Sequence, residues 1–138
     1  MERNISTFHS LAKNLNKIHK TSCEGVTVVQ SSILHEISLH DNPSMQTVAN
    51  ALGMDITTFS RQIGTLEKIK LIKRIPYSKD RRILLLTLTE TGQNLVGEIN
   101  NHIGATMEAS LSSMNDFERE TVMRSMHLLS EKLKSIEK

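Results

Sequence analysis

The basic residues of this 138-residue chain are concentrated in its middle, between Arg61 and Arg82. Eight lysines and arginines lie there against two acids, a local charge of +6 in a chain whose total is +2. Hydroxyl and amide side chains precede and accompany them, from Ser44 onward. Arginine can bind guanine through two hydrogen bonds, and hydroxyls and amides can meet base edges or phosphates. The combination predicts a nucleic-acid interface.

Two short helices are expected to position the hydroxyl and amide side chains. Ser44 can cap the first helix and Asp55 the second, because each side chain can accept from the free amides of a first turn. Gly53 can turn the chain between them, since glycine enters the left-handed conformation without strain. Apolar residues recur at helical spacing in both helices: Met45, Val48, Ala49 and Leu52, then Ile56, Phe59, Ile63, Leu66 and Ile69.

The other face of the second helix is polar. It carries Thr57, Thr58, Ser60, Arg61, Gln62 and Thr65. Short polar groups with one long cation suit a helix that lies in the major groove of DNA. With Ala49 at a close helix crossing and Gly53 at the turn, the spacing is that of a helix-turn-helix. The alternative interpretation is an ordinary helical hairpin with a solvated polar face.

A β-hairpin is expected directly after this helix pair. Ile72–Ile75 and Ile83–Leu88 are apolar, strand-forming runs. The segment between them, Pro76–Arg82, is polar and turn-forming. A hairpin that follows a recognition helix is a wing, so the basic segment would extend from the helix into the wing.

These motifs together resemble the MarR family of winged-helix transcription regulators. The matching residues are Thr58-Phe59-Ser60-Arg61 with Ile63 and Leu66, Leu71-Ile72 with Arg74, Asp80-Arg81-Arg82, and Leu88-Thr89-Glu90-Thr91-Gly92. Their order and spacing fit without a gap, and the likeness extends over nearly the whole chain. The combination is specific, although each piece alone is weak.

The resemblance implies one MarR-like domain over residues 1–138, mainly α with a small β-hairpin wing. Residues 28–89 would form the winged helix-turn-helix DNA-binding lobe, and residues 1–22 and 90–138 the dimerisation helices. In the wing, Asp80 would act as a brace and Arg82 would enter the minor groove, with Lys79 and Arg81 along the phosphates. A homodimer would then read a pseudo-palindromic operator in double-stranded DNA.

Long amphipathic helices are expected around the core, at residues 2–21, 28–40, 90–110 and from Asn115 onward. Asn115 and Glu118 have the spacing of a capping box. The stripes of the first three are Ile5, Phe8, Leu11, Ala12, Leu15 and Ile18; Val29, Ile33, Leu34 and Ile37; and Val96, Ile99, Ile103 and Met107. The last helix repeats with heptad spacing at Val122, Met126, Leu129, Leu133 and Ile136. That repeat gives one face of a helical dimer.

Cys23, the single cysteine, falls in a short connection after the first helix. A thiol at this place could sense oxidant or bind a soft metal. The alternative is an inert, partly buried side chain. The six histidines form no close ligand pair, so a metal site from Cys23, His35 and His102 would have to assemble across helices. We therefore expect no metal.

The chain contains no phosphate-binding loop, His-Glu-x-x-His or nucleophile elbow, so neither catalysis nor a cofactor is expected. No apolar run approaches the ~20 residues of a membrane span, and a single cysteine agrees with a reducing compartment, the cytoplasm.

The prediction is a homodimeric repressor that a small-molecule effector releases from its operator. Two alternatives stay open: a thiol- or metal-sensing regulator acting through Cys23, and a winged-helix module that binds protein.

Overall fold

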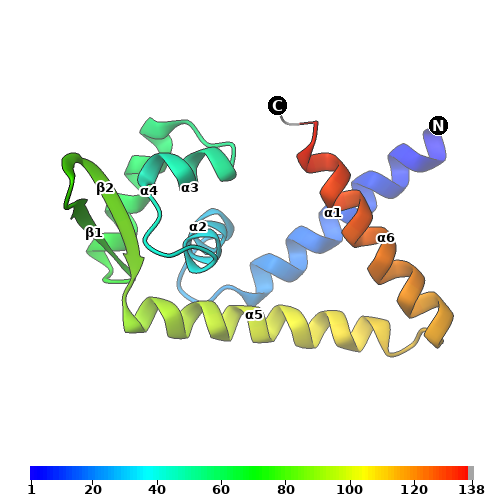
Figure 1. The fold of residues 1–138 in the computed structure, drawn as a ribbon. Helices are drawn as coiled ribbons and strands as arrows, with labels where there is room; N and C mark the ends of the chain where they lie inside the picture. Colours follow the sequence, from blue (N-terminus) through cyan, green and yellow to red (C-terminus); the bar gives the residue numbers. More distant parts are fainter. Residues whose placement is uncertain (137–138) are drawn as a thin grey trace. The chain divides into compact units, whose positions relative to one another are not determined.

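The computed structural model describes residues 1–136, which form helices and one antiparallel β-hairpin (Figure 1). The elements are α1 (Glu2–Ser22), α2 (Val28–Ser38), α3 (Met45–Ala51), α4 (Ile56–Lys68), β1 (Ile72–Tyr77), β2 (Asp80–Leu88), α5 (Glu90–Leu111) and α6 (Asp116–Lys134). The fold class predicted from the sequence, mainly α with a small hairpin wing, is confirmed. Within residues 1–136, no helix has the length and apolar character that crossing a membrane requires.

The backbone divides into two compact units, Met1–Ile103 and a second that begins at Gly104. The boundary falls inside α5. The first unit contains the helix pair and the hairpin, and the second contains the end of α5 and α6. The division into DNA-binding and dimerisation parts is a functional one and stays a prediction.

The core of the first unit is built around α4. Phe59, Ile63 and Leu66 follow each other at helical spacing and are fully buried. The residues that pack with them come from α2, α3, the hairpin, the residue before it and α5: Ile33, Leu34, Ile37, Val48, Ala49, Ile72, Leu86, Leu71 and Val96. Because one stripe of α4 is buried, the opposite stripe must face away from the core.

The predicted stripes are wrong at three positions. Val29, Ile56 and Ile69 are each nearly half exposed. Val29 and Ile56 lie in the first turns of α2 and α4, and Ile69 is the C-cap of α4. Helix ends lie at the margin of the unit, where the neighbouring elements no longer cover them. Similarly, α2 ends at Ser38 rather than at the predicted His40.

The predicted caps are confirmed. The Ser44 hydroxyl accepts from the backbone N–H of Thr47 (3.1 Å), and the Asp55 carboxylate accepts from that of Thr58 (2.9 Å). Asn115 and Glu118 form a capping box at the start of α6. Gly53 has φ +64° and turns the chain between α3 and α4. These local bonds fix where each helix begins.

The hairpin is longer than predicted and its turn is tighter. β1 continues to Tyr77 and β2 begins at Asp80, so the predicted loop Pro76–Arg82 is wrong. The strand register shifts between Pro76 and Tyr77. Proline, which has no N–H to donate, is tolerated at such an irregularity. The Asp80–Arg82 segment therefore lies on a strand.

Two backbone contacts hold the wing beside the helix pair. The N–H of Leu86 in β2 donates to the carbonyl of Pro43 (2.8 Å), and Ser44 forms an isolated β-bridge with Leu85. Both Pro43 and Ser44 directly precede α3. The hairpin and the helix-turn-helix are thus joined by main-chain bonds as well as by the core.

The start of α5 is locked onto the chain that leaves α4. Thr89 Oγ1 donates to the carbonyl of Lys70 (2.7 Å) and accepts from the N–H of Gly92 (3.0 Å), so Thr89 caps α5. The N–H of Thr89 donates to the carbonyl of Leu71 (3.0 Å). A Cβ at Gly92 would lie 2.1 Å from that carbonyl oxygen, so glycine is required there.

Apolar side chains remain exposed on α1 and α6 of the described chain. On α1 they are Ile5, Phe8, Leu11 and Leu15, with exposed fractions from 39% to 64%. On α6 they include Met126, Leu129 and Leu133, from 37% to 55%, whereas Ile136 of the predicted heptad repeat lies beyond the end of the helix. These are the faces that the sequence assigned to a dimer.

The Gly92 contact gives a stability prediction. Gly92→Ala should destabilise the fold by roughly 2 kcal/mol, because the new methyl group meets backbone that cannot move independently. Gly97→Ala, in the same helix, is the control, since a Cβ there meets nothing within 4 Å. It should stabilise α5 by up to ~1 kcal/mol. Chemical denaturation at one protein concentration measures both, and equal stability of the two variants would contradict the contact.

Candidate nucleic-acid interface

The first turn of α4 is fixed by Asp55. Its carboxylate accepts from the backbone N–H of Thr58 and also from the Thr58 hydroxyl (2.8 Å). The Thr58 backbone N–H, with the hydroxyl second, lowers the pKa of Asp55 from its ordinary 3.8. The Thr58 hydroxyl, predicted to face DNA, is thus already donating to the cap and can offer only its lone pairs to a partner.

The face of α4 opposite its buried stripe carries Thr57 and Arg61. Both side chains are exposed, and Lys68 lies on the same face two turns further on. Within residues 1–136, the Arg61 guanidinium has no ion-pair partner. An unpaired guanidinium near the start of an exposed helix face can bind phosphate or guanine.

The remaining polar residues predicted on α4 lie at its flanks. Ser60 is half-buried, and the Thr65 hydroxyl donates to the carbonyl of Arg61 (3.3 Å). Gln62 is half-buried, and its Oε1 accepts from Nε2 of Gln30 in α2 (3.3 Å). Of the six predicted positions, Thr57, Thr58, Arg61 and Thr65 are therefore exposed, whereas Ser60 and Gln62 are partly covered by the fold.

The wing carries a braced arginine. Asp80 Oδ1 accepts from the Arg82 backbone N–H (3.0 Å) and from Nε (3.0 Å), and Oδ2 accepts from a terminal nitrogen of Arg82 (3.1 Å). The Arg82 side chain is 90% exposed, whereas that of Asp80 is 32% exposed. The carboxylate thus holds the guanidinium at two points while the rest of the arginine stays free.

This pairing keeps both groups charged. Arg82 lowers the pKa of Asp80 from its ordinary 3.8, through the side-chain hydrogen bonds first and the backbone bond second. Asp80 in turn raises the pKa of Arg82. Because the pKa of Asp80 is lowered, the brace contributes fully well above the ordinary value of 3.8 and is lost as the pH falls through the lowered pKa. The brace is therefore intact at neutral pH.

The other basic residues of the segment differ in availability. Lys79 in the turn and Arg81 on β2 are exposed, as predicted. Arg74 instead forms an ion pair with Glu67 of α4 (3.1 Å), and a Cβ on Gly64 would lie 3.9 Å from its guanidinium. Arg74 therefore packs across α4 and contributes little to a cationic surface.

Ser44 and Arg82 line the same hollow, of about 340 Å³, between the start of α3 and the wing. The other lining residues are Met45, Gln46, Ile56, Ile83 and Leu84. The predicted site residues of the helix pair and the wing thus meet around one depression in the surface.

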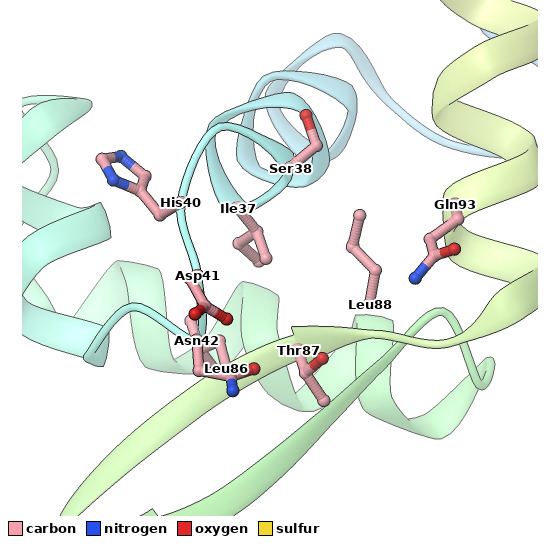
Figure 2. Close-up of a pocket in the computed structure, with 9 residues that line it drawn as sticks. All are labelled: Ile37, Ser38, His40, Asp41, Asn42, Leu86, Thr87, Leu88 and Gln93. Carbon is pink, nitrogen blue, oxygen red and sulfur yellow. The ribbon is translucent and has the colours of Figure 1, made fainter.

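A second hollow, of about 270 Å³, lies between the end of α2, β2 and α5. Its lining residues are Ile37, Ser38, His40, Asp41, Asn42, Leu86, Thr87, Leu88 and Gln93. Figure 2 shows Leu88 rising from β2 toward α2, with the Gln93 amide directed into the space beside it. Three of the lining residues are apolar, namely Ile37, Leu86 and Leu88, and the other six are polar, so a ligand there would be held mainly by polar contacts.

Cys23 is the C-cap of α1 and half-buried, and its thiol donates to the carbonyl of His19 (3.1 Å). No group of three metal-ligating side chains occurs within residues 1–136, so the structure does not bring Cys23, His35 and His102 together.

Gln30 and Glu67 were not among the residues predicted to form the site. Thr27 and Gln30 have the spacing of a capping box, which could have identified the cap of α2. The contacts of Gln30 with Gln62 and of Glu67 with Arg74 join different elements. Local sequence patterns do not predict such contacts.

Comparisons with known proteins agree with this geometry. Residues 26–84, which contain α2, the helix pair and most of the hairpin, match the model of the MarR family. The HTH-type transcriptional regulator YybA of Bacillus subtilis is 24% identical over 119 residues, which is 85% of this chain and 79% of that protein.

Solved structures show the same fold. A MarR transcriptional regulator from Methanosarcina mazei superposes with a TM-score of 0.84 at 22% identity, covering 99% of both chains. FabT from Streptococcus pneumoniae, solved in complex with DNA, gives a TM-score of 0.87 at 18% identity over 98% of both chains. The match of residues 26–84 to the MarR family model and these superpositions show that the chain contains a MarR-type domain and has the winged helix fold of MarR transcriptional regulators.

Proposed function

We propose that this regulator is a homodimeric repressor, expected in the cytoplasm, which blocks a promoter by binding a pseudo-palindromic operator and leaves it when a small effector binds. The observation that carries the proposal is the Asp80–Arg82 brace, because it presents a fixed, exposed cation beside an exposed polar face of α4. FabT was solved with DNA, and a MepR variant of S. aureus was solved with an oligodeoxyribonucleotide.

The wing and α4 would contact different grooves. A guanidinium suits the narrow, electronegative minor groove, and a carboxylate brace reduces the entropy lost when the side chain is ordered there. Arg82 would make this contact, with Lys79 and Arg81 along the phosphates. Thr57 and Arg61 lie in the N-terminal half of α4, the part of a recognition helix that meets base edges.

Dimerisation would bring two such surfaces together. The exposed apolar residues of α1 and α6 are the faces that a second copy would cover. Two recognition helices bind successive major grooves when they lie ~34 Å apart, which explains why the operator should be a pseudo-palindrome. A single protomer would bind weakly, so the dimer would also supply most of the affinity.

The hollow between α2, β2 and α5 is the proposed effector site. It joins the DNA-binding lobe to the helix that begins the predicted dimerisation region, through Gln93. A ligand there would touch β2 near the Leu86–Pro43 bond that holds the wing beside α3. An effector bound more tightly in one arrangement of these elements would shift the population toward it and change affinity for DNA.

Cys23 gives the thiol-sensing alternative little support, because its thiol is half-buried and already bonded to a carbonyl. A winged helix that binds protein would need neither an unpaired Arg61 nor a braced Arg82.

The wing contact can be tested by Arg82→Ala. Operator affinity should fall roughly five- to a hundredfold, and the slope of log K against log salt should become shallower by about one unit per protomer. Asp80→Asn is the matched variant, because it keeps the cation but removes the charged brace. It should cost less affinity and leave the slope nearly unchanged. Wild-type affinity in Arg82→Ala, measured by fluorescence anisotropy, would mean that the wing stays outside the groove.

The dimer face can be tested by Leu129→Glu, which places a charge in the exposed heptad stripe of α6. Sedimentation should show a shift from dimer to monomer, together with at least tenfold weaker operator binding. His127→Glu is the control, since position 127 lies on the opposite face of the same helix. If both variants sediment as the wild type does, α6 does not form the interface.

The effector site can be tested by Gln93→Phe, whose ring would occupy the hollow. A compound that releases the wild type from DNA should need at least a tenfold higher concentration with this variant, because its space is filled. Asn94→Phe places the same ring on the next, exposed residue of α5 and should respond like the wild type. An unchanged response of Gln93→Phe would place the effector elsewhere.

A further inference from the structure

A chain of hydrogen bonds connects the start of α2 to the recognition helix. The backbone N–H of Thr27 donates to Oε1 of Gln30 (3.0 Å), and the N–H of Gln30 donates to the Thr27 hydroxyl (3.1 Å). Nε2 of the same Gln30 then donates to Oε1 of Gln62 in α4 (3.3 Å). Gln30 therefore serves two purposes, as a helix cap and as a partner of Gln62.

The helix cap at Thr27 sets the direction of each of these hydrogen bonds. A backbone N–H can only donate, so the Gln30 oxygen must face Thr27 and its NH₂ group must face Gln62. An NH₂ group can only donate, so Gln62 must turn its oxygen toward Gln30. The orientation of both amides follows from one fixed donor, the backbone of Thr27.

This arrangement leaves the NH₂ group of Gln62 as its outward group. Among residues 1–136, no side-chain polar atom is both buried and unpaired, and Nε2 of Gln62 has no partner there. The group is therefore open to solvent. Gln62 also lines an open hollow of about 320 Å³ with Thr58, so its amide is not enclosed.

We infer that Gln30 is a positioning residue for DNA recognition, which orients Gln62 so that its NH₂ donor faces one base of the operator. A free glutamine can bind adenine through two bonds, one donated and one accepted. Gln62 has its oxygen turned toward Gln30, so the group that it presents outward is its NH₂, which can donate to N7 or O6 of guanine, O4 of thymine or N7 of adenine. Cytosine, which presents only its N4 donor in the major groove, would be disfavoured at that base. The inference rests on the proposed function.

The substitution Gln30→Glu tests the inference because it reverses the direction of the hydrogen bond between residues 30 and 62. Glutamate keeps the capping box, because its carboxylate still accepts from Thr27. Its second oxygen also accepts, so Gln62 must turn its NH₂ group inward and present its oxygen to DNA. The base preference should then shift toward cytosine or adenine, whose amino groups donate, by about three- to tenfold. The added negative charge should weaken binding to all sequences alike. It cannot by itself change the preference for one base over another, so a shift in preference reports the turned amide.

Selection of bound sequences from a random duplex pool, run in parallel for each variant, measures that preference. Gln62→Ala is the control: it should remove the preference at this base, and adding Gln30→Glu to it should change nothing further. The expected result is a shift at one base, present in Gln30→Glu and absent in the double variant. An unchanged preference in Gln30→Glu, or no change in Gln62→Ala, would overturn the inference while the wild type still selects its operator. A wild type that selects no sequence would instead overturn the proposed function, and the inference with it.

Discussion

Burial of one stripe of α4 is the constraint on which the rest of this structure depends. Phe59, Ile63 and Leu66 are inaccessible to solvent, and side chains from α2, α3 and the hairpin close around them. Burying three large apolar side chains contributes several kcal/mol, of the order of the whole stability of a small domain. Rotation of α4 about its axis would expose this stripe. The outward direction of Thr57 and Arg61 is therefore fixed by the core, before any contact with DNA.

Electrostatic contacts then adjust which of the remaining groups are available. Glu67 binds Arg74 against the side of α4, whereas Asp80 holds Arg82 in an exposed position on β2. Each pair consists of one carboxylate and one arginine, yet the first removes a cation from the surface and the second orients one. The same principle applies to neutral groups, since Gln30 occupies the oxygen of Gln62 and leaves its donor free. A count of net charge does not distinguish an arginine held against the fold from one that is exposed.

The sequence predicted what depends on local chemistry. The caps at Ser44, Asp55 and Asn115, the turn at Gly53 and the middle of the α4 stripe (Phe59, Ile63 and Leu66) follow from residue types at fixed spacing, and the structure confirms them. The strand ends were missed because the irregularity at Pro76 allows pairing to continue past a residue that resembles a turn. Val29 and Ile56 were misplaced because periodicity identifies a face of a helix but not how far the neighbours reach along it. The Gln30–Gln62 contact joins residues 32 positions apart and depends on tertiary packing, which no local pattern encodes.

The central claim is that one surface, formed by α4 and the wing, recognises a particular DNA sequence. Binding of the protein to a pool of random duplexes at increasing salt, with sequencing of what remains bound, tests it most directly. The account predicts an enriched pseudo-palindrome and a slope of log K against log salt of about −4 or steeper, since each protomer offers several cations to the phosphates. Weak binding with a shallow slope and no enriched sequence would contradict it.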